Sequence, residues 1–132
     1  MKYVIDTHGL IWFLEGNSRL STTAKAILSQ ADAQLIIPTT TLAEAVWVVE
    51  QGKTSIPDPK DIISVVQADP RVVIYPFDQE VLAMTLKLSA INEMHNRQIA
   101  ATAIILASKG EDVRLLTCDK NLTDSGLVAV VW

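Results

Sequence analysis

Four oxygen-bearing side chains, far apart in the sequence, occupy positions where metal chemistry could use them. Asp6 ends the apolar run YVI, and Asp119 comes shortly after the run RLLT. Glu44 lies in the first turn of a predicted helix that follows the run LII, and Asn96 begins the most apolar helical segment. Clustered carboxylates repel one another and need a counter-charge, which Mg²⁺ or Mn²⁺ can supply because they prefer oxygen ligands. If these side chains converge, we expect a site of the kind that hydrolyses phosphodiester bonds of RNA or DNA.

Each of these residues also has a purely structural interpretation. Asp6 can be a turn residue at a strand end, and Asn96 a helix N-cap. Thr41 and Glu44 have the spacing of a capping box, and Asp119 can cap the short turn KNLTDSG. All of these alternatives stay open for the single residues. Taken together, two strand-end acids and one helix-start acid favour a shared pocket.

The elements that must position these side chains alternate between strands and helices. Strands are predicted at 2–6, 34–38, 71–76, 113–117 and 127–132, and helices at 9–16, 21–32, 40–52, 58–69, 78–91 and 96 to about 109. Ser21, Asp58 and Asp78 are predicted N-caps, and Gly16 a helix end. The alternation indicates an α/β fold with a central, mainly parallel, twisted sheet flanked by helices. Ligands of such sheets bind beyond the carboxyl ends of the strands, where Asp6 and Asp119 would meet if strands 2–6 and 113–117 are neighbours.

Composition limits the class of protein. A chain of 132 residues, 49% of them apolar, indicates a single folded domain over residues 1–132. The net charge of −4 argues against broad electrostatic binding of nucleic acid, but not against a nuclease whose acidic site is neutralised by metal. The single cysteine, Cys118, indicates a reducing, cytoplasmic setting. Asp6 and His8 interrupt the apolar start, so we expect neither a signal peptide nor a membrane span.

The sequence resembles the PIN-domain ribonuclease toxins of the VapC type over nearly its whole length. YVIDTHGLIWFLEG is similar to the first motif of that family, PTTTLAEAVWVVEQGK to the second, MHNRQIAATAIILA to the third and LLTCDKNL to the fourth. The ending SGLVAVVW is similar to members whose first motif begins Asp-Thr-His. The resemblance implies a three-layer PIN-like fold and a metal-dependent endoribonuclease, the toxin of a type II toxin–antitoxin system.

The resemblance also implies roles for particular residues. It places the metal-binding and catalytic positions at Asp6, Glu44, Asn96 and Asp119, with candidate supporting residues Thr7, Thr117, His95 and Arg97. The third family motif usually reads His-Asp-Arg, so Asn96, as either the natural residue or an introduced substitution, replaces a metal-binding aspartate. A neutral amide is a weaker ligand than a carboxylate. We therefore expect normal folding, at most one firmly held Mg²⁺ or Mn²⁺, and weak or absent cleavage of RNA.

Partners follow from the same resemblance. It implies a VapB-type antitoxin whose basic C-terminal segment enters the acidic cleft, an RNA substrate, a homodimer and no membrane. Trp47 lies off the apolar stripe of its helix, which indicates either an interface or burial under a neighbouring helix. Arg97 and Lys120 either hold substrate phosphate or pair with neighbouring acids.

Three rival functions are considered beside the nuclease. A catalytically inactive PIN module that only binds the antitoxin is the main alternative. A phosphatase of the haloacid dehalogenase kind needs a second aspartate two residues after the first, where this chain has His8. A receiver domain needs paired acids near its first strand and a phosphate-accepting aspartate on a middle strand, and neither is evident.

Overall fold

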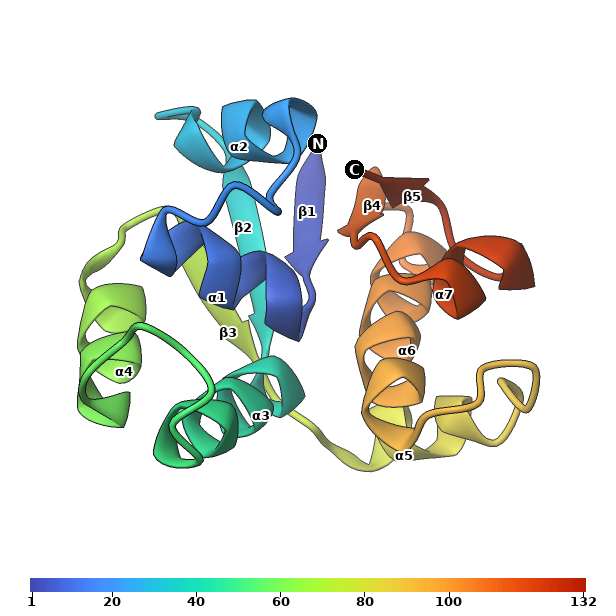
Figure 1. Ribbon diagram of the computed structural model, residues 1–132. Coiled ribbons are helices and arrows are strands. Elements are labelled where there is room, and N and C mark those ends of the chain that lie inside the picture. The colour runs from blue at the N-terminus through green and yellow to red at the C-terminus, as the bar shows by residue number, and fades with distance from the viewer.

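One sheet of five parallel strands forms the centre of the protein (Figure 1). The computed structural model describes residues 1–132. The strands are β1 (Lys2–Ile5), β2 (Gln34–Pro38), β3 (Val72–Tyr75), β4 (Val113–Leu116) and β5 (Val130–Val131), in the spatial order β3-β2-β1-β4-β5. Ile5 of β1 lies opposite Leu116 of β4 in a parallel register. The predicted parallel sheet is confirmed, and β1 and β4 are the neighbours that a shared pocket requires.

Seven helices connect and cover the strands. They are α1 (Thr7–Glu15), α2 (Thr22–Ser29), α3 (Thr39–Glu50), α4 (Pro59–Ala68), α5 (Gln79–Thr85), α6 (Met94–Ser108) and α7 (Lys120–Ser125). The predicted caps are confirmed: the side chains of Ser21, Asp58 and Asp78 each accept a hydrogen bond from a backbone N–H of the following first turn. Gly16 ends α1 in the left-handed conformation at φ 66°, which glycine adopts without a steric penalty. None of these helices has the length and apolar composition needed to cross a membrane.

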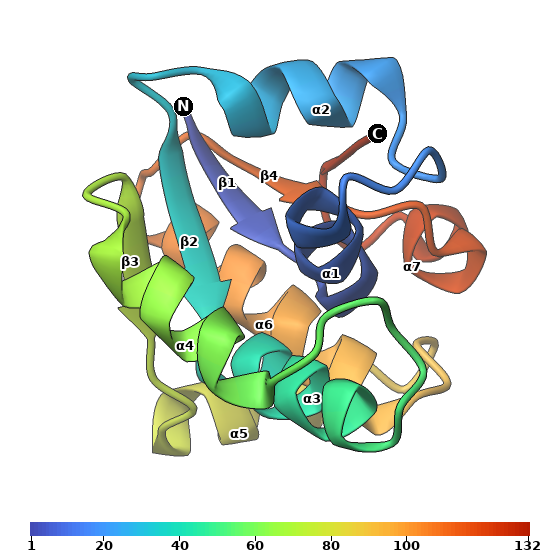
Figure 2. The same ribbon diagram turned by 60° about the vertical axis from the view of Figure 1, so that its left-hand side comes forward.

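The helices form a layer on each face of the sheet, which gives the expected three layers. Side chains of a strand alternate between the faces. Ile5 packs into an apolar cluster with residues of α1, α2, α3 and α4, whereas Val4 packs into a second cluster with residues of α5, α6 and α7. Figure 2 shows α1 and α4 in front of the sheet and α6 behind it. Burial on both faces explains why the central strands are continuous apolar runs.

Two predicted elements are shorter than the sequence indicated. The predicted helix at 78–91 ends at Thr85, and consecutive turns follow, in which Leu88 N–H donates to Thr85 O and Ile91 N–H to Leu88 O. Leu88 and Ile91 are nevertheless buried. The apolar spacing therefore predicted correctly which residues are buried, but it predicted a helix where the backbone forms turns. The predicted last strand at 127–132 is reduced to Val130–Val131.

Candidate metal centre

Asp6 is a buried carboxyl at the junction of β1 and α1. Its backbone N–H donates to Leu116 O of β4 (3.3 Å), and its Oδ1 accepts from Gly9 N–H (2.8 Å), which makes it the N-cap of α1. The residue is only 5% exposed. Burial raises the pKa of Asp6 above its ordinary value, although hydrogen bonds from Thr117 and Gly9 and the charge of His8 oppose that shift. Burial thus disfavours the ionised form of this carboxyl, which a bound cation would stabilise.

Asp119 lies beside Asp6 because β4 is the neighbour of β1. Asp119 Oδ1 accepts from Leu122 N–H (2.9 Å) and caps α7, and its own N–H donates to Thr117 Oγ1 (3.0 Å). Its charge contributes to the raised pKa of Asp6. Asp119 Oδ2 accepts from Asn96 Nδ2 at 3.3 Å. We call Asp6, Asp119 and Asn96 the first acidic group.

Glu44 approaches from α3. The hydroxyl of Thr7 donates to Glu44 Oε1, and Glu44 Oε2 lies 3.3 Å from His95 Nδ1. The predicted capping box is wrong: Thr41 lies inside α3 and its hydroxyl donates to Ile5 O at the end of β1 (2.9 Å). This bond holds the first turns of α3 against the strand that carries Asp6. Thr41 thus serves the site by positioning Glu44 rather than by capping its helix.

Glu93 is a fourth carboxylate that the sequence analysis did not identify. Asn96 does not cap α6, because the helix begins at Met94 and Glu93 is its N-cap, accepting from His95 N–H (3.0 Å) and Asn96 N–H (2.8 Å). Glu93 Oε1 also lies 2.8 Å from His95 Nδ1. Burial raises the pKa of Glu93, but the two N–H bonds and His95 outweigh it, so its pKa is below the ordinary value. An acid three positions before Asn96 was the signal that could have identified this cap.

One ligand atom from each of Glu44, Glu93 and His95 lies within 4.8 Å of the others, a spacing that allows a shared metal ion. We call these three residues the second acidic group. Asp6 and Asp119 lie outside that set, so the four positions predicted from the sequence do not form one tight cluster. Thr7 joins the two groups, since it follows Asp6 in the chain and donates to Glu44.

The remaining candidates differ in their relation to the site. Thr117 is fully buried and contacts both Asp6 and Asp119. Arg97 faces elsewhere: its guanidinium donates to the carbonyls of Ile91 and Ser89, in the segment before α6. Arg97 therefore stabilises that segment and pairs with neither acidic group.

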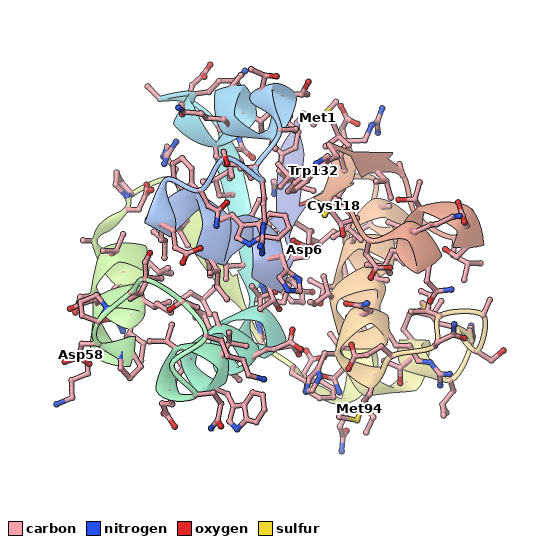
Figure 3. All side chains as sticks on the ribbon, in the orientation of Figure 1. Met1, Asp6, Asp58, Met94, Cys118 and Trp132 are labelled. Carbon is pink, nitrogen blue, oxygen red and sulfur yellow. The ribbon has the colours of Figure 1, made fainter.

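The donor chemistry fits a hard divalent cation. No side-chain nitrogen of a lysine or arginine lies within 4.0 Å of a carboxylate oxygen of Asp6, Asp119, Glu44 or Glu93. Oxygen atoms predominate at the site, and Mg²⁺ and Mn²⁺ prefer oxygen ligands. Figure 3 shows Asp6 at the end of β1 with Cys118 near it. The pKa of the Cys118 thiol is raised, mainly by burial and also by the charges of Asp6 and Asp119. The site thus gathers carboxylates that no lysine or arginine pairs with, and His95 is the one basic side chain in ion-pair range, of Glu44 and Glu93.

Comparison with known proteins adds an independent observation. The family model of the PIN domain matches residues 3–126. Among solved structures, VapBC2 from Rickettsia felis, bound to a DNA fragment from its promoter, has 16% identity and a TM-score of 0.71 over 99% of this chain and 98% of that one. Mycobacterium tuberculosis VapC20, a Sarcin-Ricin loop cleaving toxin, has 13% identity and a TM-score of 0.69 over 96% and 97%. FitAcB from Neisseria gonorrhoeae has 19% identity and a TM-score of 0.63 over 97% and 95%. No curated protein matches the sequence.

Proposed function

This chain belongs to the PIN domain family, and on that basis we propose that it is a metal-dependent endoribonuclease, the toxin of a VapC-type toxin–antitoxin pair. One observation supports the proposal most strongly. Asp6 is 5% exposed, lies close to the charge of Asp119, and has no lysine or arginine within 4.0 Å. Such a pair is costly unless a bound cation compensates it.

Residues of both acidic groups would take part in metal binding and hydrolysis. Asp6, Asp119 and the Asn96 amide offer oxygen ligands on one side, and Glu44 offers them on the other. Mg²⁺ or Mn²⁺ bound there would supply the charge stabilisation and water activation that phosphodiester hydrolysis needs. Glu44, held by the Thr7 hydroxyl and near His95, can accept a proton from the attacking water. Thr117 keeps Asp6 and Asp119 in place through its hydroxyl.

Asn96 should weaken metal binding at this site because of its contact with Asp119. Its Nδ2 donates to Asp119 Oδ2 (3.3 Å), so a neutral amide partly satisfies a carboxylate that would otherwise need a cation. An aspartate at this position would turn that contact into a repulsion that only a cation relieves. We therefore expect little ribonuclease activity from the chain as it stands.

A nuclease assay tests the proposal directly. The chain and its Asn96→Asp variant are incubated with labelled RNA in Mg²⁺, Mn²⁺ or EDTA. We expect cleavage by Asn96→Asp at least tenfold faster than by the parent chain, and none in EDTA. Equal activities of the two proteins would refute the role of position 96, and activity in EDTA would refute the role of the metal.

The substrate and partners are proposed from the neighbours. VapC20 is described as a toxin that cleaves the Sarcin-Ricin loop, and VapBC2 is described as bound to a DNA fragment from its promoter. By analogy, this chain would act on RNA in the cytoplasm as a homodimer, and a VapB-type antitoxin would inhibit it. A basic antitoxin segment complements the acidic groups. If a small open reading frame adjoins the gene, we expect its product to form a stable complex with this chain on co-expression.

A second candidate is an inactive module that only binds the antitoxin. The hydrogen bond from Asn96 to Asp119 favours it, because the bond stabilises the site without a metal. Restored activity in Asn96→Asp would show that only position 96 separates the chain from a working nuclease. An Asn96→Asp variant that binds antitoxin but never cleaves RNA would support the inactive module.

A further inference from the structure

A hollow of about 710 Å³ opens beside the acidic groups, between α1 and the segment that follows α3. Its lining includes His8, Trp12, Glu15, Arg19 and Lys53. His8 follows Asp6 by two residues in the chain, so this wall of the hollow lies near the metal centre.

Two aromatic rings, those of His8 and Trp12, lie in the lining of the hollow. The ring of Trp12 lies 5.3 Å from the His8 ring and 5.9 Å from the ring of Trp132, which meets it edge-on. Trp47 is 55% exposed and lines a second hollow of about 320 Å³ with Glu44 and His95. Lys53 connects the two hollows, because it lines the first and lies over the Trp47 ring, which lines the second.

Two cations next to these rings have no acidic partner. The Arg19 guanidinium lies 5.9 Å from the centre of the Trp12 ring, and Lys53 Nζ lies 5.7 Å from that of Trp47. Neither forms an ion pair within 4.0 Å, whereas Lys2, Arg71, Lys109 and Arg114 all do.

The one acid in the lining is Glu15, whose pKa is lowered mainly by the hydrogen bond from Ser55 N–H and also by the charge of Arg19. Glu15 accepts from Ser55 N–H (2.8 Å), from the Ser55 hydroxyl (3.0 Å) and from Asn17 Nδ2 (3.2 Å). The hollow is thus a local cationic and aromatic region in a protein of net charge −4.

We propose that the two hollows bind the single-stranded RNA segment next to the phosphodiester at the acidic groups, with the exposed Trp47 stacking on a base and Arg19 and Lys53 contacting phosphates. The proposal rests on the ribonuclease function and names the surface that selects its substrate. Exposed aromatic rings stack on unpaired bases of any identity, and free cations bind the backbone phosphates. A basic antitoxin segment fits less well, because Arg19 and Lys53 would repel it.

RNA binding in EDTA, where no cleavage occurs, tests the two hollows by themselves. The probes are a 12-nucleotide single-stranded RNA, fluorescein-labelled for anisotropy and unlabelled for tryptophan fluorescence, and a duplex of the same sequence. The variants are Arg19→Ala with Lys53→Ala, and Trp47→Ala. The matched control is Lys25→Ala with Lys87→Ala, which removes the same charge from exposed residues that line neither hollow.

We expect the single strand to quench tryptophan fluorescence and to bind at least tenfold more weakly to the Arg19/Lys53 variant. The slope of log K against log salt should fall by about 1.4, because each phosphate contact contributes about 0.7 for single strands. Trp47→Ala should bind several-fold more weakly, the control within twofold of the parent, and the duplex weakly to all. Equal weakening of both double variants, no quenching, or displacement of the RNA by an arginine-rich peptide that itself quenches would overturn the proposal.

Kinetics in the Asn96→Asp background separate this proposal from the ribonuclease function. There the Arg19/Lys53 substitutions should raise KM about tenfold with little change in kcat. Cleavage with an unchanged KM would overturn the proposed RNA binding in the hollows, and the proposed ribonuclease function would stand. RNA bound in the hollows without any cleavage by Asn96→Asp would support that binding and overturn the ribonuclease function.

Discussion

The side-chain amide of Asn96, in the first turn of α6, donates a hydrogen bond at 3.3 Å to Asp119, the N-cap of α7. The pKa of the buried Asp6 is raised mainly by burial, and the charge of Asp119 raises it further. The amide brings only a partial positive charge to two neighbouring carboxylates. The stability of this site without metal, and its affinity for metal, should therefore respond in opposite directions to a change at position 96.

Asn96→Asp should destabilise the metal-free protein. The substitution replaces a hydrogen bond by repulsion between carboxylates, which we expect to cost about 1–2 kcal/mol. For a chain of this size, that lowers Tm by roughly 3–8 °C. Thermal unfolding in EDTA, followed by circular dichroism, measures it. Asn92→Asp adds the same charge at an exposed position and should leave Tm nearly unchanged; equal shifts for both variants would contradict the account.

Asp6→Asn should have the opposite effect. Asparagine can still cap α1, and it removes a carboxyl that is 5% exposed and whose burial opposes ionisation. We expect a higher Tm than that of the parent in EDTA at pH 8, and no response to added Mn²⁺. Differential scanning fluorimetry with and without MnCl₂ provides the comparison. A lower Tm in EDTA, or an undiminished Mn²⁺ shift, would argue against Asp6 as a ligand.

Glu93→Ala should destabilise α6 and disturb His95. The variant loses both hydrogen bonds from the first turn, and loss of an N-cap typically costs about 1 kcal/mol. Glu93→Gln retains an acceptor oxygen and should lose less. Urea unfolding at pH 7 gives the free energies. If the alanine and glutamine variants match the parent within error, Glu93 is not the cap that we describe.

Asp69→Asn should destabilise the protein in a pH-dependent manner. Arg71 donates to Asp69 Oδ2 (2.7 Å) and also to the carbonyls of Leu28 (2.7 Å) and Gln30 (2.8 Å), which ties the start of β3 to the end of α2. The hydrogen bond from Arg71 is the main cause of the lowered pKa of Asp69. Because the folded-state pKa is below the unfolded one, the stabilisation is present above pH 4 and is lost as the pH falls through the folded-state value.

We therefore expect Asp69→Asn to be about 1 kcal/mol less stable than the parent at pH 7, with the difference shrinking toward pH 3. Urea unfolding at both pH values provides the test. Asp32→Asn, at an exposed aspartate without an ion pair, serves as the control. A difference that stays constant from pH 7 to pH 3 would rule out the Arg71 interaction as its source.

Much of this architecture could be predicted because its determinants are local. Ser21, Asp58 and Asp78 cap helices through bonds within their own first turns, and uninterrupted apolar runs indicate buried parallel strands. The sequence predicted that Asp6 would meet Asp119 only if β1 and β4 were neighbours, and it did not predict that they are. That order depends on packing between distant segments, which one sequence does not encode locally.

The wrong predictions concern residues whose side chains bond to a different group from the one that the local sequence pattern indicates. Thr41 and Glu44 match a capping box, but the Thr41 hydroxyl bonds to Ile5 O instead. Asn96 suits an N-cap, but the carboxylate of Glu93 takes that position one turn earlier and places Asn96 against Asp119. Arg97, expected near the acids, instead bonds to the backbone before α6.

The central claim is that the first acidic group, Asp6, Asp119 and Asn96, binds a divalent cation next to Glu44 of the second group. Titration with Mn²⁺, followed by electron paramagnetic resonance of the free ion, tests it without requiring catalysis. We predict at most one weakly bound Mn²⁺ per chain in the parent, at least tenfold tighter binding or a second ion in Asn96→Asp, and none in Asp6→Asn. Equal affinity and stoichiometry in all three proteins would contradict the account.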